Sequence, residues 1–386
     1  MRGWRLGWQF LFVAFAFAPA FYAAPPEAIA GTTVDQLDQL VSRVCRQDDG
    51  AAARQLAGVT LSERASTEKL AKWASELHGA HAREAIMAVT DAAAHFDPPA
   101  GEIPAMSPPD AETQQQILAR TVEYVKKSLS KLPDFMARRQ TTSFEVTTES
   151  RLTAQFMWSG GLAVKRKQYL DFYALGPAKS IGTNDARLFW IGTLDQAVTF
   201  RDGAEVQGAS PAGKGSSNTM PLRMTTRGEF GTILNVVLVD VPQDNFVWGH
   251  WEQGAQGPLA VFRYSVPRDQ SHFAVQWNAN ELPEYPAYHG VIAVDPATGS
   301  IFRITVQTSG REEGFLYQSS ILVEYAPTSI GGVNYICPAR GVAMIKFFDA
   351  MADLDTQPPP ISFRISINDV SFTGYQIFRS ESRILP

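Results

Sequence analysis

The spacing of apolar residues changes near residue 140, and this change constrains the fold more than any other feature of the chain. Between about residues 35 and 95 apolar side chains recur every three or four positions, as in Leu70, Trp73, Ala74 and Leu77, which is the period of an amphipathic helix. From about residue 140 the period falls to two, the spacing of a strand with one buried face. We therefore expect an α+β protein, with a helical N-terminal region followed by a sheet.

Proline-rich segments and turn signals divide the chain into five stretches. We expect a signal peptide at 1–24, a helical N-terminal region at 25–96, a Pro-rich linker at 97–110, a connecting helix within 111–138 and an antiparallel β domain at 139–386. The linker holds five prolines, which cannot donate backbone hydrogen bonds. The connecting helix should begin after Asp110 as its N-cap and end at Leu132-Pro133.

Many short segments of period two, joined by turn residues, follow the connecting helix. The turns include Arg201-Asp202-Gly203, where glycine tolerates the backbone of a tight hairpin, and Asp295 to Gly299. This pattern predicts a large, curved, mainly antiparallel sheet, either a half-barrel or a sandwich. We expect strands at Ala163–Tyr173 and His272–Trp277 among others. The apolar run Phe230–Val239 fits either a helix, which we favour, or a buried strand.

The first residues have the three parts of an export signal. Arg2 and Arg5 precede an apolar run at 10–18, and small residues follow up to Ala24. The run is shorter than the roughly 20 residues of a membrane span. We expect cleavage after Ala20 or near Ala24. The mature protein should then be periplasmic or extracellular, with no membrane span. The alternative is that the segment is not cleaved and stays as an anchor.

Charge and cysteine content restrict the partners. The net charge is −5 and is spread along the chain, so we expect no nucleic-acid partner. Export permits a disulfide between the two cysteines, Cys45 and Cys337. The alternative is two buried free thiols.

Common catalytic and metal-binding motifs are absent from the sequence. It contains no G-x-S-x-G, H-E-x-x-H, P-loop or C-x-x-C motif, so no cofactor or metal is expected and an enzyme is not favoured. His78 and His81 lie three residues apart on a helix, near Glu76 and Glu84. They are typical of a solvated helix face rather than of a metal site.

Two short segments offer candidate binding residues. In regular strand alternation Trp248, His250 and Glu252 point one way and Trp251 the other. That face forms either an acid–base pair beside an aromatic ring or a cross-strand aromatic cluster with a bonded histidine.

Tyr288 and His289 are the second pair of candidates. They follow Glu284 in a proline-containing segment that could contact a sugar or peptide, or that simply connects two strands.

The aromatic content bears on the ligand. The chain has 23 Phe, 11 Tyr and 8 Trp. In a curved sheet such side chains either fill the covered side as core or line a pocket for an apolar molecule.

Several stretches resemble known groups of proteins. Gly254 to Pro267, Tyr288-His289-Gly290 through Gly299, Ile321 to Tyr325, Ile330 to Pro338 and Leu132 to Phe135 resemble a family of uncharacterised secreted bacterial proteins. The hairpin Asp295 to Gly299, the strand that leaves it and the turn Ile330-Gly331-Gly332 are also similar to periplasmic lipoprotein carriers. That second resemblance implies a half-barrel that shelters acyl chains under helices.

Three functions fit these features. The first is a non-catalytic exported binding protein for an apolar or lipid-like ligand, or for an envelope protein. The second is a hydrolase of envelope or extracellular polymers that uses His250 with Glu252, or His289 with Glu284. The third is an assembly partner that docks through its helical N-terminal region.

Overall fold

The computed structural model describes residues 31–129, 132–147, 188–201, 204–207, 229, 232–242, 245–276, 283–312, 315–349 and 363–377. The expected signal peptide at 1–24 and the expected strand Ala163–Tyr173 lie outside these residues. Among the residues described, no helix is both long enough and apolar enough to cross a membrane.

Four helices form an N-terminal helical domain: α1 (Val34–Val44), α2 (Asp49–Leu56), α3 (Thr67–Glu76) and α4 (Ala80–Ala92). Side chains at their N-caps fix three of the starts: the hydroxyls of Thr33 and Ser66 and the carboxylate of Asp48 each accept a backbone N–H of the first turn. Trp73 is fully buried in the core of this domain. Its indole Nε1 donates to Asp38 Oδ1 over 2.6 Å, so the largest core side chain is also satisfied as a donor.

The linker and two further helices follow. The linker contains the short 3-10 helix η1 (Ala100–Glu102) and leads into α5 (Ala111–Leu129), whose Asp110 accepts the N–H of Thr113. Helix α5 ends close to the predicted stop at Leu132-Pro133, because proline cannot continue a helix. The β domain begins before the expected residue 139, because Phe135 to Arg138 already belong to a strand. The expected helix near 230–239 is confirmed as α8 (Thr232–Asp240).

The strands form one ten-stranded sheet in the order β3-β2-β1-β10-β9-β8-β7-β6-β5-β4. Their bounds are β1 (Phe135–Thr147), β2 (Leu188–Arg201), β3 (Ala204–Gln207), β4 (Val247–Gly254), β5 (Gly257–Val266), β6 (Tyr288–Val294), β7 (Ile301–Glu312), β8 (Phe315–Ile330), β9 (Val333–Asp349) and β10 (Phe363–Ile377). All neighbours are antiparallel. The expected α+β class is thereby confirmed, with one open sheet rather than a two-sheet sandwich.

One predicted strand differs in the structure. Of the segment His272–Trp277, the described residues 272–276 form an isolated bridge, between Val275 and Glu284, next to the 3-10 helix η5 (Arg268–Gln270).

The first strand of the domain, β1, pairs with the last, β10, along almost its whole length. Ends of the β domain that are far apart in the sequence therefore lie side by side.

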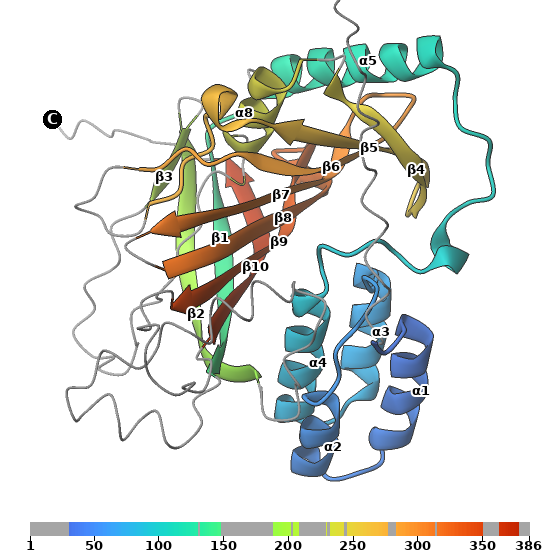
Figure 1. Cartoon of the computed structure of the whole chain (residues 1–386), viewed down its shortest axis with the longest axis vertical. Helices are drawn as coiled ribbons and strands as arrows, with labels where there is room; N and C mark the ends of the chain where they lie inside the picture. Colours follow the sequence, from blue (N-terminus) through green and yellow to red (C-terminus); the bar gives the residue numbers. More distant parts are fainter. Residues whose placement is uncertain are drawn as a thin grey trace, which may run out of the picture.

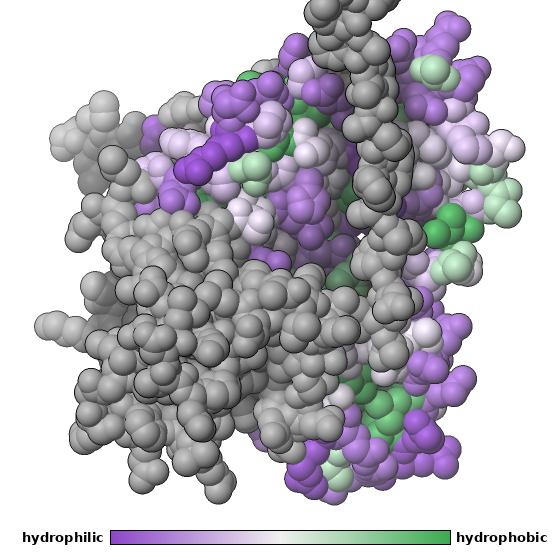
Figure 2. Space-filling model, in the orientation of Figure 1, coloured by the Kyte–Doolittle hydropathy of each residue, from purple (hydrophilic) through white to green (hydrophobic). Residues whose placement is uncertain are grey.

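The sheet is covered on both faces (Figure 1). Helices α5 and α8 pack on one face, here called the α5/α8 face, with Val323 of β8 in their core. The neighbouring residue Leu322 points the other way and packs with Ala88 and Ala94 of the helical domain. We call this second side the helical-domain face. In the view of Figure 2 most of the described surface that is visible is polar, with a few apolar patches.

Candidate functional site

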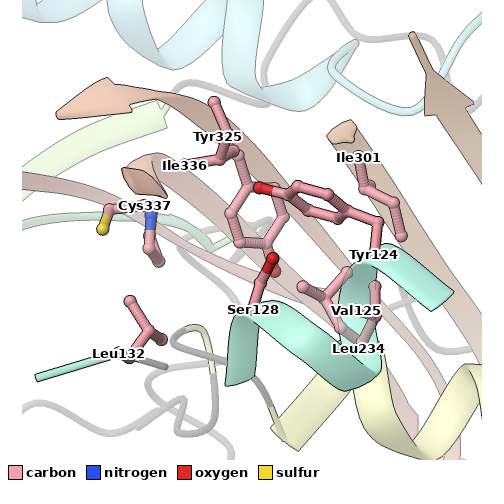
Figure 3. A pocket seen from close by; sticks show the side chains of 10 residues that line it. Tyr124, Val125, Ser128, Leu132, Leu234, Ile301, Tyr325, Ile336 and Cys337 are labelled. Carbon is pink, nitrogen blue, oxygen red and sulfur yellow. The ribbon is translucent and has the colours of Figure 1, made fainter. Parts of the chain in front are cut away.

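Side chains of the described residues pack closely on the α5/α8 face of the sheet. A cavity of about 20 Å³ lies between α5, α8 and strands β7 to β9. Figure 3 shows Tyr124, Val125 and Ser128 of α5 converging with Leu234 and Tyr325 on this space. Such a volume holds roughly one water molecule, whereas ligand pockets have about 300–1,000 Å³. Among the described residues of this face, the aromatic side chains therefore belong to the core.

A bulge in β4 changes which candidate residues share a face. The pairing with β5 shifts between Trp248, which lies opposite Phe262, and His250, which lies opposite Val261. Trp248 therefore lies with Trp251 on the α5/α8 face, where the two ring centroids are 5.0 Å apart. The prediction that Trp248 shares a face with His250 and Glu252 is wrong, because Gly249 is the extra residue that resets the alternation.

Glu252 is buried at the interface between the sheet and the helical domain. It accepts from Arg64 Nη2 over 2.8 Å and from both terminal nitrogens of Arg303. Burial alone would raise the pKa of Glu252, but the hydrogen bonds from Arg303 and the charges of Arg303 and Arg64 hold it well below its usual range. His250 Nε2 lies 3.7 Å from the same carboxylate. A carboxylate so strongly held by two guanidinium groups is a structural anion and not a general base.

Tyr288 and His289 lie on opposite faces of β6. Tyr288 is buried, and its hydroxyl donates to Asp240 Oδ2 over 2.8 Å. Burial, together with that carboxylate, raises the pKa of Tyr288. His289 is exposed on the helical-domain face. The structure does not bring these two candidates together, and neither of them lines a cavity with Trp248 or Glu252.

His272, which suggested no role in the sequence, has a defined partner. Its Nδ1 lies 2.5 Å from Oδ1 of Asp240, whose side chain is completely buried, while the histidine is 68% exposed. The pair joins the end of α8 to the segment before β6. Because 32 residues separate the two, no local pattern could have indicated it.

The remaining sequence candidates have ordinary surroundings. Cys45 and Cys337 are both free: Cys45 packs against the helical domain's core and Cys337 within the sheet domain, so the structure has two free thiols in place of the disulfide. His81, near the start of α4, contacts Glu84 over 3.3 Å and is 71% exposed. The prediction that His78 lies on the same helix is wrong, because His78 belongs to the connection between α3 and α4. In the part of the chain that the structure describes, no group of three metal-ligand side chains occurs.

A second charged cluster lies at the interface with the helical domain, around Arg340 of β9. Its Nε donates to Asp369 Oδ2 over 2.8 Å, its Nη2 donates to Asp91 of α4, and its Nη1 lies 3.9 Å from Glu324. Thr67 of α3 donates to the same Glu324 over 2.7 Å. Burial and the nearby Asp369 raise the pKa of Asp91 well above its usual value, which favours the protonated form of this carboxyl.

Beside this cluster a cleft of about 500 Å³ separates α3 and α4 from the sheet. We call it the interdomain cleft, and it is the candidate functional site. Its volume is in the range of small-molecule pockets. The surface of the cleft is mainly apolar with a few charged groups. The described residues that line it are Thr67, Leu70, Ala71, Ala74, Ala80, Arg83, Glu84, Met87, Thr142, Trp190, Thr193, Arg340 and Asp369.

The elements that build the cleft explain why the sequence did not reveal it. Leu70, Ala71 and Ala74 lie on the side of α3 that faces the sheet, and Trp190 of β2 is 49% exposed opposite them. These residues are more than a hundred positions apart. The only local signal was the apolar stripe on α3, which the sequence assigned to core.

Comparison of the chain with family models, with curated proteins and with solved structures yields no match. The resemblances to uncharacterised secreted bacterial proteins and to periplasmic lipoprotein carriers therefore stay predictions.

Proposed function

We propose that this chain is a non-catalytic, exported binding protein of the cell envelope that holds an apolar or amphiphilic small molecule in the interdomain cleft. The observation that carries the proposal is the cleft itself, a space of about 500 Å³ with mainly apolar walls and charged groups at its floor. Pockets for small molecules combine these two features, apolar area for affinity and a few polar groups for orientation.

The location of the ligand differs from the one expected at first. An acyl chain under α5 and α8, as in the lipoprotein-carrier resemblance, would need space that the described core occupies: the cavity there measures about 20 Å³. The helical-domain face offers the room instead. The helical N-terminal region then serves as one wall of the binding site.

The geometry does not favour the hydrolase alternative that uses His250 with Glu252. Glu252 is engaged by two arginines. General acid–base catalysis needs a group that can exchange its proton near the working pH. The ionised and enclosed Glu252 does not meet that requirement.

The test is to fill the cleft from one wall. Ala71 is an exposed residue of α3 that lines the cleft, so Ala71→Trp introduces an indole into the binding space without changing a core position. Ser75→Trp on the same helix adds the same group at an exposed position outside the lining. The probe is N-phenyl-1-naphthylamine, an uncharged apolar dye whose fluorescence rises in apolar surroundings.

We expect the wild-type protein and the Ser75→Trp variant to bind the dye alike. The Ala71→Trp variant should bind at least about tenfold more weakly, the equivalent of about 1.4 kcal/mol. Equal binding by all three proteins would contradict the proposal, as would absence of dye binding to the wild type. The export part is checked by cell fractionation and by sequencing the N-terminus of the mature protein.

A further inference from the structure

The floor of the interdomain cleft contains more carboxyl groups than cations. Arg340 is the guanidinium of the charged cluster there, and Asp369, Asp91 and Glu324 surround it. On the cleft wall Arg83 and Glu84 add one charge of each sign, so the surplus of carboxyl groups remains. Two nitrogens of Arg340 already donate to carboxylates, and the third faces Glu324. An incoming anion would have to break these bonds beside the charges of Asp369 and Glu324, so the floor disfavours an anionic ligand.

Asp91 has a buried oxygen that lacks a donor. Its side chain is completely buried, and Oδ2 has no hydrogen-bond partner. Burial and the charge of the nearby Asp369 raise the pKa of Asp91, which favours a proton on this carboxyl. A proton on Asp91 offsets part of the surplus negative charge of the floor in the unliganded protein.

The walls of the cleft suit an apolar chain next to a cation. Trp190 presents a half-exposed indole ring, and Leu70 and Met87 add aliphatic surface. The face of an indole attracts cations as well as apolar groups. Asp369 lines the cleft and is the carboxylate of the cluster that a ligand can reach directly.

We propose that the interdomain cleft selects a protonated amine on an apolar chain, with the ammonium at Asp369 and the chain between Trp190 and α3. This inference rests on the proposed function and names its ligand class. The ammonium donates an N–H to the Asp369 carboxylate and takes over the charge-balancing role of the proton on Asp91. That proton leaves Asp91 for solvent, so one cation enters as one proton departs.

The test compares three ligands of equal chain length, decylamine, decanol and decanoate, as competitors of the dye at pH 7 and below micellar concentrations. We expect decylamine to bind about tenfold or more tightly than decanoate, the difference that one charge-assisted hydrogen bond makes. Decanoate binding as tightly as decylamine would overturn the proposed amine selectivity and leave the cleft a binding site. Failure of all three to displace the dye would instead overturn the proposed function.

Two further measurements locate the amine. The variant Asp369→Asn should weaken decylamine about tenfold and leave decanol unchanged, with decanol binding as the control for an intact cleft. Should this variant lose decanol as well, the wild-type ligand series decides the question alone. Calorimetry in phosphate and in Tris buffer should show proton release with decylamine and none with decanol. No proton release with decylamine would overturn its placement beside Asp91 and Asp369.

Discussion

Individual charged residues hold the two layers of this protein together. Glu252 sits between Arg64 of the helical domain's side and Arg303 of the sheet, and Arg340 joins the sheet to Asp91 of α4. Removing one member of a buried ion pair is costly because the partner keeps its charge without solvent. The stability of the interface between the helical domain and the sheet is therefore sensitive to the loss of a single charged group.

We expect Glu252→Gln to lower the free energy of unfolding by about 3–5 kcal/mol, since two buried guanidinium groups would face a neutral amide. Chemical denaturation at pH 7 measures the change. Glu123→Gln on α5 is the control: Glu123 forms a pair with Lys127 that is exposed on both sides, and its loss should not be measurable. An effect of Glu252→Gln as small as that of the control would contradict the assigned role.

The same carboxylate gives the sign of a pH dependence. The folded pKa of Glu252 is held below its unfolded value, so its contribution is present above about pH 4.5 and is lost as the pH falls. Asp91 acts in the opposite direction. Its pKa is raised, so the folded state takes up a proton there and loses stability as the pH rises above about 4 toward the folded pKa.

At the scale of elements, the turn between β6 and β7 is pressed against α5. Gly299 has φ +76°, and a Cβ added there would lie 2.5 Å from the backbone carbon of Arg120. The turn needs glycine for two independent reasons, its left-handed backbone and the close helix. The close contact between this turn and Arg120 thereby sets the position of α5 on the sheet.

Gly299→Ala should lower the free energy of unfolding by more than about 2 kcal/mol, because backbone strain and a backbone clash add. Gly332→Ala separates the two effects. Gly332 has φ +85° with open space around the position of a Cβ, so only the strain of about 1 kcal/mol applies. Thermal unfolding of both variants would measure the difference; equal losses would mean that the contact with α5 contributes nothing.

Much of the element pattern could be predicted from the sequence, and the exceptions have local causes. Helices α1, α3, α4 and α5 follow from apolar spacing, whereas the apolar run of α8 fits a helix or a buried strand. Helix α2 has only eight residues and no apolar stripe that a helical period would reveal. The β4 bulge at Gly249 reversed the expected orientation of Trp248. An alternation rule cannot anticipate one extra residue, because a bulge depends on the pairing strand.

The candidate site could not be predicted in the same way. The interdomain cleft takes residues from α3, α4, β1, β2, β9 and β10, and Asp91, Arg340 and Asp369 come from three of these elements. Each looks unremarkable in its own segment. Only the packing of the helical domain on the sheet places three carboxyl groups around one arginine.

For the molecule as a whole, the two cysteines belong to separate cores. Cys337 is buried in β9 and burial raises its pKa to about 12, while Cys45 is partly exposed at the end of α1. Thiolate is the reactive form of cysteine. The two sites should therefore differ in reactivity as well as in place.

A thiol-specific reagent used without reductant should count two thiols in the denatured protein. In the native protein Cys45 should react first and Cys337 slowly. Mass spectrometry of the labelled protein assigns each site. A denatured protein with no reactive thiol would show that the chain forms the disulfide after all.

The pairing of β1 with β10 also bears on how fast the molecule can fold. Phe135 lies opposite Ile377 in the central part of the sheet, so more than two hundred residues must be present before these two strands meet. Folding rates fall as the mean sequence separation of contacting residues rises, since a long loop must close first. A chain emerging from synthesis can complete its helical domain early but cannot close its sheet until nearly the last strand is available. The pairing thus makes the last strand of the chain a condition for the native state, so a chain that lacks this strand cannot complete its sheet.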